Sequence, residues 1–235
     1  MTAEPIVAMR GVVKNYNALR PLRIAELSIA PGARIAISGI DAAGAEVMLN
    51  LVTGASLPDQ GEVRIFGRNT ATVSDGDEWL ASLDSFGIVS ERAVLLEGAT
   101  LTQNLALPFA LDIDPVPEAT MARVESLAGE CGIAREFLSQ RAGDVPAAVR
   151  TRVHLARAIA LEPKLLVMEH PTATLDERDR GAFGGLVARV CEARTLTLLA
   201  ITQDLLFASA AAHETLSLDG ATGRLRAARR SWWRR

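Results

Sequence analysis

The stretch Gly39-Ile40-Asp41-Ala42-Ala43-Gly44-Ala45-Glu46-Val47 decides the fold predicted for this chain. The apolar run Ile35–Ile37 precedes it and predicts a buried strand, and residues 48–52 continue with helical spacing of apolar side chains. Two glycines separated by four residues, between a strand and a helix, form the frame of a phosphate-binding loop. In such loops the glycines let backbone N–H groups face a phosphate, and the helix N-terminus adds its positive dipole end.

The polar chemistry of such a loop is absent. Ala45 occupies the position of the phosphate-binding lysine, and Glu46 occupies that of the metal-binding serine or threonine. One hypothesis is that Glu46 is an internal anion that fills the helix end, since a carboxylate there is stabilising by roughly 0.3–1 kcal/mol. The alternative is drift after loss of function.

Composition predicts one domain with a large core, because 49% of the 235 residues are hydrophobic. The net charge of −3 gives no case for nucleic-acid binding. Cys131 and Cys191 fit no metal or redox spacing and are expected to be buried free thiols in a reducing compartment. The first five residues do not read as a secretory signal, and no apolar run is long enough to span a bilayer. A cytoplasmic protein is therefore expected, unless a partner holds it at a membrane.

Hydrophobic periodicity predicts an alternation of strands and helices along the chain. The predicted strands are Ile6–Val13, Leu22–Ile29, Arg34–Ser38, Glu62–Phe66, Phe86–Val89, Leu165–Met168, Leu196–Ile201 and Thr215–Leu218. The predicted helices are Gly44–Thr53, Asp75–Ser82, Val116–Gln140, Ala147–Glu162, Glu177–Arg194 and one that begins at Asp204. This order predicts an α/β fold with a mostly parallel sheet and right-handed crossovers. Within one domain of residues 1–235, we expect an α/β core from residues 1–90 and 151–235, and a helical insertion from about residues 91–150.

Further landmarks follow the loop in a fixed order. They are Tyr16, Pro31-Gly32, Asn50, Gly54, Gly61-Glu62-Val63, residues 102–106, Leu155-Ala156-Arg157-Ala158, Glu162-Pro163, Leu165–Met168, Pro171-Thr172, Leu175-Asp176 and residues 201–204. With these landmarks the chain resembles, over nearly its whole length, the nucleotide-binding subunit of ABC (ATP-binding cassette) transporters. From composition alone, Tyr16 is expected to be a half-buried aromatic at a strand end. The resemblance instead implies the position of the adenine-stacking ring.

The resemblance implies a RecA-like P-loop NTPase core with an N-terminal antiparallel β part and a helical subdomain. It also implies ATP and Mg²⁺ as cofactors, a homo- or heterodimer with another ABC subunit, and docking on a transmembrane permease subunit at the inner face of the cell membrane. The implied cofactor-binding positions are Tyr16, Gly39, Gly44, Ala45, Glu46, Val47 and Glu91. The tail of residues 229–235, rich in Arg and Trp, is either a frayed end or an anchor to a membrane surface or partner.

Most positions that would carry hydrolysis depart from the family pattern. Glu91 stands at the glutamine-loop position, where a carboxylate can still bind metal, and residues 145–149 (VPAAV) stand where the LSGGQ signature belongs. Glu169 replaces the Walker B aspartate and is a second possible metal ligand. His170 replaces the glutamate that polarises the attacking water, and an imidazole can act as a general base. Gln203 replaces the switch histidine.

These departures leave three hypotheses. The first is a catalytically degenerate ABC subunit, a structural or regulatory half of a membrane transport complex. The second is a divergent but active ATPase that energises transport, with Glu169 as metal ligand and His170 as base. The third is a binding module that has left transport. Losing several contacts, each worth roughly 10²–10³ in rate, favours the first.

Overall fold

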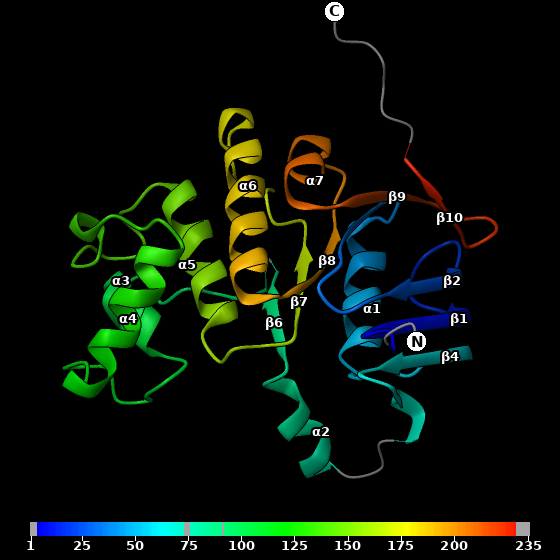
Figure 1. Cartoon of the computed structure of the whole chain (residues 1–235), viewed down its shortest axis with the longest axis horizontal. Coiled ribbons are helices and arrows are strands. Elements are labelled where there is room, and N and C mark those ends of the chain that lie inside the picture. Colours follow the sequence, from blue (N-terminus) through cyan, green and yellow to red (C-terminus); the bar gives the residue numbers. More distant parts are fainter. Residues whose placement is uncertain (1–3, 73–75, 91, 229–235) are drawn as a thin grey trace, which may run out of the picture.

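The computed structural model describes residues 4–72, 76–90 and 92–228, which form two sheets with helices between and beside them (Figure 1). The strands are β1 (Val7–Lys14), β2 (Leu22–Ile29), β3 (Arg34–Ser38), β4 (Gln60–Ile65), β5 (Arg68–Asn69), β6 (Phe86–Val89), β7 (Leu165–Glu169), β8 (Thr197–Ile201), β9 (Glu214–Asp219) and β10 (Arg224–Ala227). The helices are α1 (Ala42–Val52), α2 (Gly76–Leu83), α3 (Leu101–Ala106), α4 (Glu118–Glu130), α5 (Ala147–Ile159), α6 (Glu177–Arg194) and α7 (Leu205–Ala211). Two short 3₁₀ helices are η1 (Thr70–Thr72) and η2 (Arg135–Phe137).

The larger sheet has six strands in the order β10-β9-β3-β8-β7-β6. Its five strands from β9 to β6 are parallel, and β10 pairs antiparallel with β9. The smaller sheet, β2-β1-β4-β5, is wholly antiparallel and comes from the N-terminal part of the chain. The predicted α/β class, with a mostly parallel sheet and an N-terminal antiparallel part, is confirmed.

Helix α1 lies between the two sheets (Figure 1). Met48, Leu51 and Val52 are fully buried on it and share one core cluster with the apolar side chains of β1, β2 and β4. The same cluster contains one face of the parallel strands. Because the helix is covered on both sides, its position is fixed by packing rather than by helix propensity.

The interior strands β7 and β8 are buried on both faces, as a continuous apolar run predicts. On β7, Leu165 and Val167 point into the cluster around α1, whereas Leu166 and Met168 point into a second cluster with α5, α6 and α7. The two-residue period of a strand therefore divides one run of apolar residues between two cores.

The helix predicted over Val116–Gln140 is wrong in its extent. Helix α4 ends at Glu130, and the short η2 follows after a break. Gly132 has a φ of 65°, a left-handed conformation that ends helices. Pro117 is the N-cap of α4. The short elements α3, β5 and β10 were not predicted individually.

Both cysteines are buried free thiols, as predicted. Burial raises the pKa of Cys131 and of Cys191 to about 12, so neither thiol ionises near neutral pH. Both cysteines pack among apolar side chains of the core, so their role is structural.

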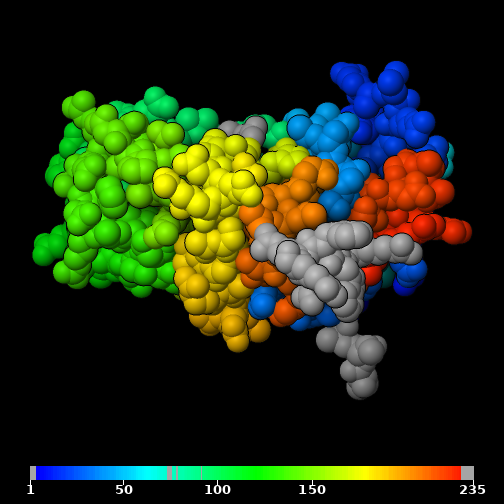
Figure 2. Space-filling view, turned by 90° about the horizontal axis from the view of Figure 1, so that it is seen from above, coloured from blue at the N-terminus to red at the C-terminus, as the bar shows by residue number. Residues whose placement is uncertain are grey.

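The helices of the middle part of the chain gather at one end of the molecule. In the space-filling view these residues, coloured green, form that end, and α6 and α7 cross the middle of the face shown (Figure 2). The division into an α/β core and a helical subdomain at residues 91–150 stays a prediction. Among the described residues, no helix is both long and apolar enough to cross a membrane.

Shortening one buried side chain of α1 tests its packing. Met48→Ala is expected to lower the free energy of unfolding by about 2–5 kcal/mol, because it opens a cavity between the two sheets. Leu19→Ala is the matched control, since Leu19 is 105% exposed and its truncation should change stability by less than about 0.5 kcal/mol. Urea unfolding followed by circular dichroism measures both, and equal effects would contradict the packing described.

Candidate functional site

The carboxyl ends of the parallel strands meet at one edge of the larger sheet, where open α/β sheets bind ligands. Gly39 follows β3, Arg92 follows β6, Glu169 ends β7 and Gln203 follows β8. A cleft of about 740 Å³ opens at this edge. Gly39, Glu169, His170 and Gln203 all line it, so the structure brings these four sequence-predicted residues together.

The two glycines of the loop are required by close contacts within the chain. Gly39 has a φ of 85°, and a Cβ there would lie 2.7 Å from the carbonyl oxygen of Leu218. A Cβ on Gly44 would lie 2.9 Å from the Asp41 carboxylate and 3.2 Å from the Tyr16 hydroxyl. The glycines thus leave room for neighbouring protein groups to pack against the loop.

Asp41 occupies the helix end that the sequence hypothesis assigned to Glu46. It is the N-cap of α1, and its carboxylate accepts a hydrogen bond of 2.7 Å from the Gly44 N–H. Glu46 lies beyond the first turn, which carries no acidic residue. The helix-end role proposed for Glu46 is therefore wrong, because the carboxylate that accepts a hydrogen bond from the first turn of α1 is that of Asp41.

Tyr16 also contacts the Asp41 carboxylate. The Tyr16 ring is half-buried, as composition predicted, and its hydroxyl hydrogen-bonds to Asp41. Burial, the charge of Asp41 and this hydrogen bond together raise the pKa of Tyr16. The tyrosine at the implied base-stacking position is thus engaged with the loop itself.

Gln203 ties the start of the loop to the end of β8. Its Nε2 donates to the Ile40 carbonyl at 2.8 Å, and its Oε1 accepts from the Gly39 N–H at 3.3 Å. A neutral amide can satisfy a donor and an acceptor together. Gln203 therefore holds Gly39 and Ile40 in place without carrying charge.

Arg92 links the two acidic positions of the site. One terminal nitrogen lies 2.9 Å from the Glu46 carboxylate, and the other lies 2.8 Å from that of Glu169. Glu169 is only 8% exposed, whereas Arg92 and Glu46 are about half exposed. Sequence reasoning missed both Arg92 and Asp41, although Arg92 adjoins the glutamine-loop position and Asp41 is a typical N-cap residue just before a helix.

His170 follows Glu169 directly and has an unusual backbone. Its φ is 43°, a left-handed value that is uncommon outside glycine. Its N–H donates to the Ile201 carbonyl at 2.9 Å, while its Nε2 is buried with no hydrogen-bond partner among the described residues. It also lines a cavity of about 350 Å³ with Glu169 and His154. Burial, followed by the charges of Arg157 and Arg150, lowers the pKa of His154.

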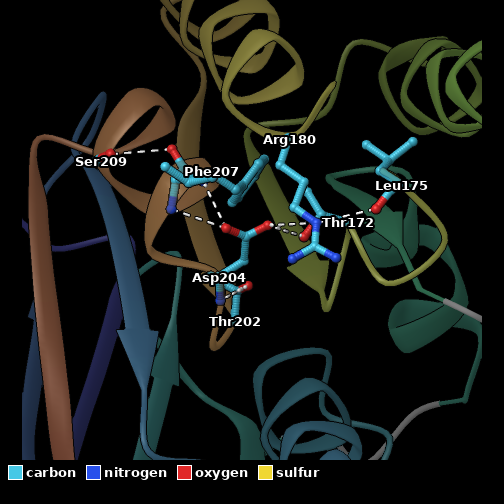
Figure 3. Close-up of polar contacts among 8 residues, drawn as sticks. Thr172, Leu175, Arg180, Thr202, Asp204, Phe207 and Ser209 are labelled. Carbon is cyan, nitrogen blue, oxygen red and sulfur yellow. Dashed lines mark hydrogen bonds and ion pairs between the residues drawn. The ribbon is translucent and has the colours of Figure 1, made fainter. Parts of the chain in front are cut away.

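A second polar cluster fixes the segments that carry His170 and Gln203 (Figure 3). Asp204 caps α7 by accepting from the N–H groups of Leu206 and Phe207 at 2.9 and 3.2 Å. Its carboxylate also accepts from the Thr172 hydroxyl at 2.7 Å and lies 3.7 Å from Nε of Arg180. The segment after β7 is thereby joined to the segment after β8.

The remaining predicted positions lie apart from the cleft or outside the described residues. Ala45 is fully buried in the core around α1, and Val47 packs against that core. Residues 145–149 span the start of α5, which begins at Ala147, and Pro146 is its N-cap without a side-chain hydrogen bond. Glu91 lies outside the residues that the structure describes.

The residues present do not match the donor set of a magnesium–triphosphate site. No lysine stands at position 45, and Glu46, in place of a neutral hydroxyl, is paired with a guanidinium. The amides of Gly39 and Gly44 are engaged by side chains of this chain. Among the described residues, no group of three or more His, Cys, Asp or Glu side chains is arranged to hold a metal ion.

Comparison with known proteins gives consistent matches. Residues 22–173 match the family model described as ABC transporter. The chain is 28% identical to the lipoprotein-releasing system ATP-binding protein of Alcanivorax borkumensis, covering 95% of this chain and 99% of that protein. It is 29% identical to the Fe(3+) ions import ATP-binding protein of Mesorhizobium japonicum, covering 83% of this chain but only 53% of that protein. The chain therefore spans about half the length of the iron-import relative.

A solved structure supports the fold. The dimeric ATP-binding cassette MJ0796, bound to ADP and Pi, superposes with a TM-score of 0.77 at 23% identity. The match covers 95% of this chain and 99% of that one. At this level of identity the likeness shows the fold alone.

The contact between Tyr16 and Asp41 can be measured directly, because Tyr16 is the only tyrosine in the chain. Alkaline titration followed by tyrosinate absorbance should give a pKa above the usual value of about 10. Asp41→Asn should lower that pKa, since it removes the negative charge, although burial will keep it raised. Asp219→Asn removes an aspartate charge that does not contribute to the raised pKa of Tyr16, so it should leave that pKa unchanged. A titration unaffected by Asp41→Asn would contradict the contact.

Proposed function

The chain belongs to the ABC transporter family, and from that premise we propose that it is a non-hydrolysing subunit of a membrane transport complex. In this proposal it keeps the shape of an ATP-binding subunit and acts as a structural or regulatory half of the complex. The carrying observation is that side chains of the chain itself engage the groups that would face magnesium triphosphate.

Two backbone donors of the loop support this proposal. The Asp41 carboxylate bonds the Gly44 amide, and Gln203 bonds the Gly39 amide. A phosphate that enters the loop would have to displace both oxygens, and the Asp41 charge would repel it. At about 4–5 Å and an effective dielectric near 20, repulsion between like charges costs a few kcal/mol per pair.

The charges beside the loop support it as well. Glu46 and Glu169 share one guanidinium, that of Arg92, so this group carries an excess of negative charge when both carboxylates are ionised. In a working phosphate loop, a lysine and a metal ion would instead supply positive charge against the phosphates.

One observation favours the alternative of an active ATPase. The buried Nε2 of His170 has no hydrogen-bond partner among the described residues. His170 directly follows Glu169 and lines the same cavity, so the two side chains are placed as a general base and a metal ligand would be. Against this, the Glu169 carboxylate is paired with Arg92, which a metal ion would have to displace. The pairing of Glu169 with Arg92 therefore favours the non-hydrolysing subunit.

Nucleotide binding and turnover test the proposal. The purified wild-type protein should bind Mg-ATP more weakly than about 1 mM in calorimetry, and should release phosphate at the background rate. Ala45→Lys/Glu46→Ser should bind Mg-ATP more tightly, because it restores a cation and a hydroxyl and removes a negative charge. Glu46→Ser alone is the matched control and should gain less.

Because Ala45 is fully buried, thermal melting must first show that the double variant is folded. Micromolar binding of Mg-ATP by the wild type, or turnover that Glu169→Gln abolishes, would refute the proposal and support the ATPase.

A transmembrane permease subunit is the proposed partner, and one surface suits such a contact. A groove of about 320 Å³ runs between the edge strand β6 and α5, and Leu107, Leu161 and Arg157 contribute to its lining. Beside it, Val94 is 70% exposed, and its carbonyl accepts from Arg157 at 2.9 Å. An exposed apolar rim around a groove is typical of a protein-binding surface. The substrate and the direction of transport are not part of the proposal, since the relatives include both import and release systems.

Co-purification tests this partner. Affinity purification of the tagged chain from detergent-solubilised membranes of its source should recover a membrane protein with several spans. Val94→Asp should reduce that recovery several-fold, whereas Leu19→Asp, at a fully exposed site, should not. Recovery of soluble partners alone would favour the third hypothesis, a binding module outside transport.

A further inference from the structure

Arg92 connects parts of the chain that are distant in sequence. Glu46 lies on α1, Glu169 ends β7, and Arg92 itself follows β6. Each terminal nitrogen of the guanidinium contacts a different carboxylate, at 2.9 and 2.8 Å. These distances are typical of charge-assisted hydrogen bonds. One cation therefore joins the helix after the loop to the end of strand β7.

We propose that the Arg92 guanidinium is the permanent cation of this site, which makes the pairing of Glu46 with Glu169 independent of a divalent metal ion. By family resemblance, a metal would lie near these two positions. The described residues do not fit such a metal, and the arginine supplies the positive charge between the two carboxylates in its place.

Burial explains why Glu169 requires a cation. Its side chain is 8% exposed, and a buried carboxylate without a partner is strongly destabilising. Glu46 is 49% exposed, so its own pairing with Arg92 contributes little, because water screens it. The buried Glu169 carboxylate is therefore the group that requires a positive charge nearby. One terminal nitrogen of Arg92 pairs with it, and the other pairs with Glu46.

Arginine suits this role for chemical reasons. Its guanidinium stays protonated at all accessible pH values, and its flat fork can bond two carboxylates at once. A divalent ion such as Mg²⁺ instead needs near-octahedral oxygen ligands and keeps several waters. A metal that entered here would have to compete with a cation that is covalently part of the chain.

The inference rests on the proposed function, since a working Mg-ATPase would have to release Arg92 whenever metal entered. Its test uses no nucleotide. Failure of this inference and failure of the proposed function therefore give different results, one in thermal melting and the other in nucleotide binding and turnover.

The test is thermal unfolding of the full chain in EDTA, in about 5 mM Mg²⁺ or Mn²⁺, and in NaCl of matched ionic strength. The melting temperature of the wild type should not respond specifically to either divalent ion. Arg92→Met should melt about 3 °C or more below the wild type, because both charge-assisted contacts of the guanidinium are then lost. Mn²⁺ should recover at least half of that loss, since a divalent cation can supply the positive charge that the guanidinium supplied.

Two further variants serve as controls. Arg92→Met/Glu46→Gln should melt above Arg92→Met and lose most of the Mn²⁺ response, because one of the two carboxylates is gone. Arg178→Met removes an arginine that is 82% exposed and lies 3.6 Å or more from its acidic neighbours. It should melt like the wild type and show no Mn²⁺ response.

Specific stabilisation of the wild type by Mg²⁺ or Mn²⁺ would overturn the proposal, and so would an Arg92→Met variant that melts like the wild type. If Arg92→Met alone does not fold, the Arg92→Met/Glu46→Gln variant should still fold, because one of the two carboxylates that paired with Arg92 is then neutral. Failure of both to fold would assign Arg92 a packing role and would also overturn the proposal.

Discussion

The burial of α1 between two sheets is the constraint on which the rest of the structure depends. The antiparallel sheet covers one side of the helix and the parallel sheet covers the other, so the helix cannot shift without opening two apolar interfaces. Its N-terminus is consequently fixed at the carboxyl edge of the parallel sheet. The loop from Gly39 to Gly44 has rigid elements at both ends, and its backbone amides keep their position whether or not a ligand meets them.

Amides held in this way must be satisfied, because polar groups at a packed edge are costly when they lack a partner. In this chain the partners are internal. Asp41 bonds the Gly44 amide, Gln203 bonds the Gly39 amide, and Arg92 pairs with the acidic side chains on α1 and β7. The fold can therefore retain the geometry of a phosphate loop while its lysine and hydroxyl positions carry alanine and glutamate. His170 is the exception, since its buried Nε2 has no partner among the described residues.

Local patterns predicted the individual elements well where the signal was regular. The bounds of Leu22–Ile29, Arg34–Ser38, Phe86–Val89 and Glu177–Arg194 agree with the structure. The prediction was wrong for Val116–Gln140, where helical spacing continued through Gly132 although that residue adopts a left-handed φ. Periodicity describes which face is apolar, and it does not detect where one residue turns the backbone. Strand β5 has only two residues, too few to show a period.

The sequence by itself determined the family, the α/β class and the loop frame, because these depend on ordered motifs and on apolar periods that are local in the chain. It also listed the changed positions, from Ala45 to Gln203. Only the tertiary structure decided which side chains meet. Arg92 lies 46 positions from Glu46 and 77 from Glu169, and Gln203 lies 164 from Gly39. The physical reason is that hydrogen bonds and ion pairs act over a few ångströms of space, and parallel strands bring distant segments of the chain to one edge.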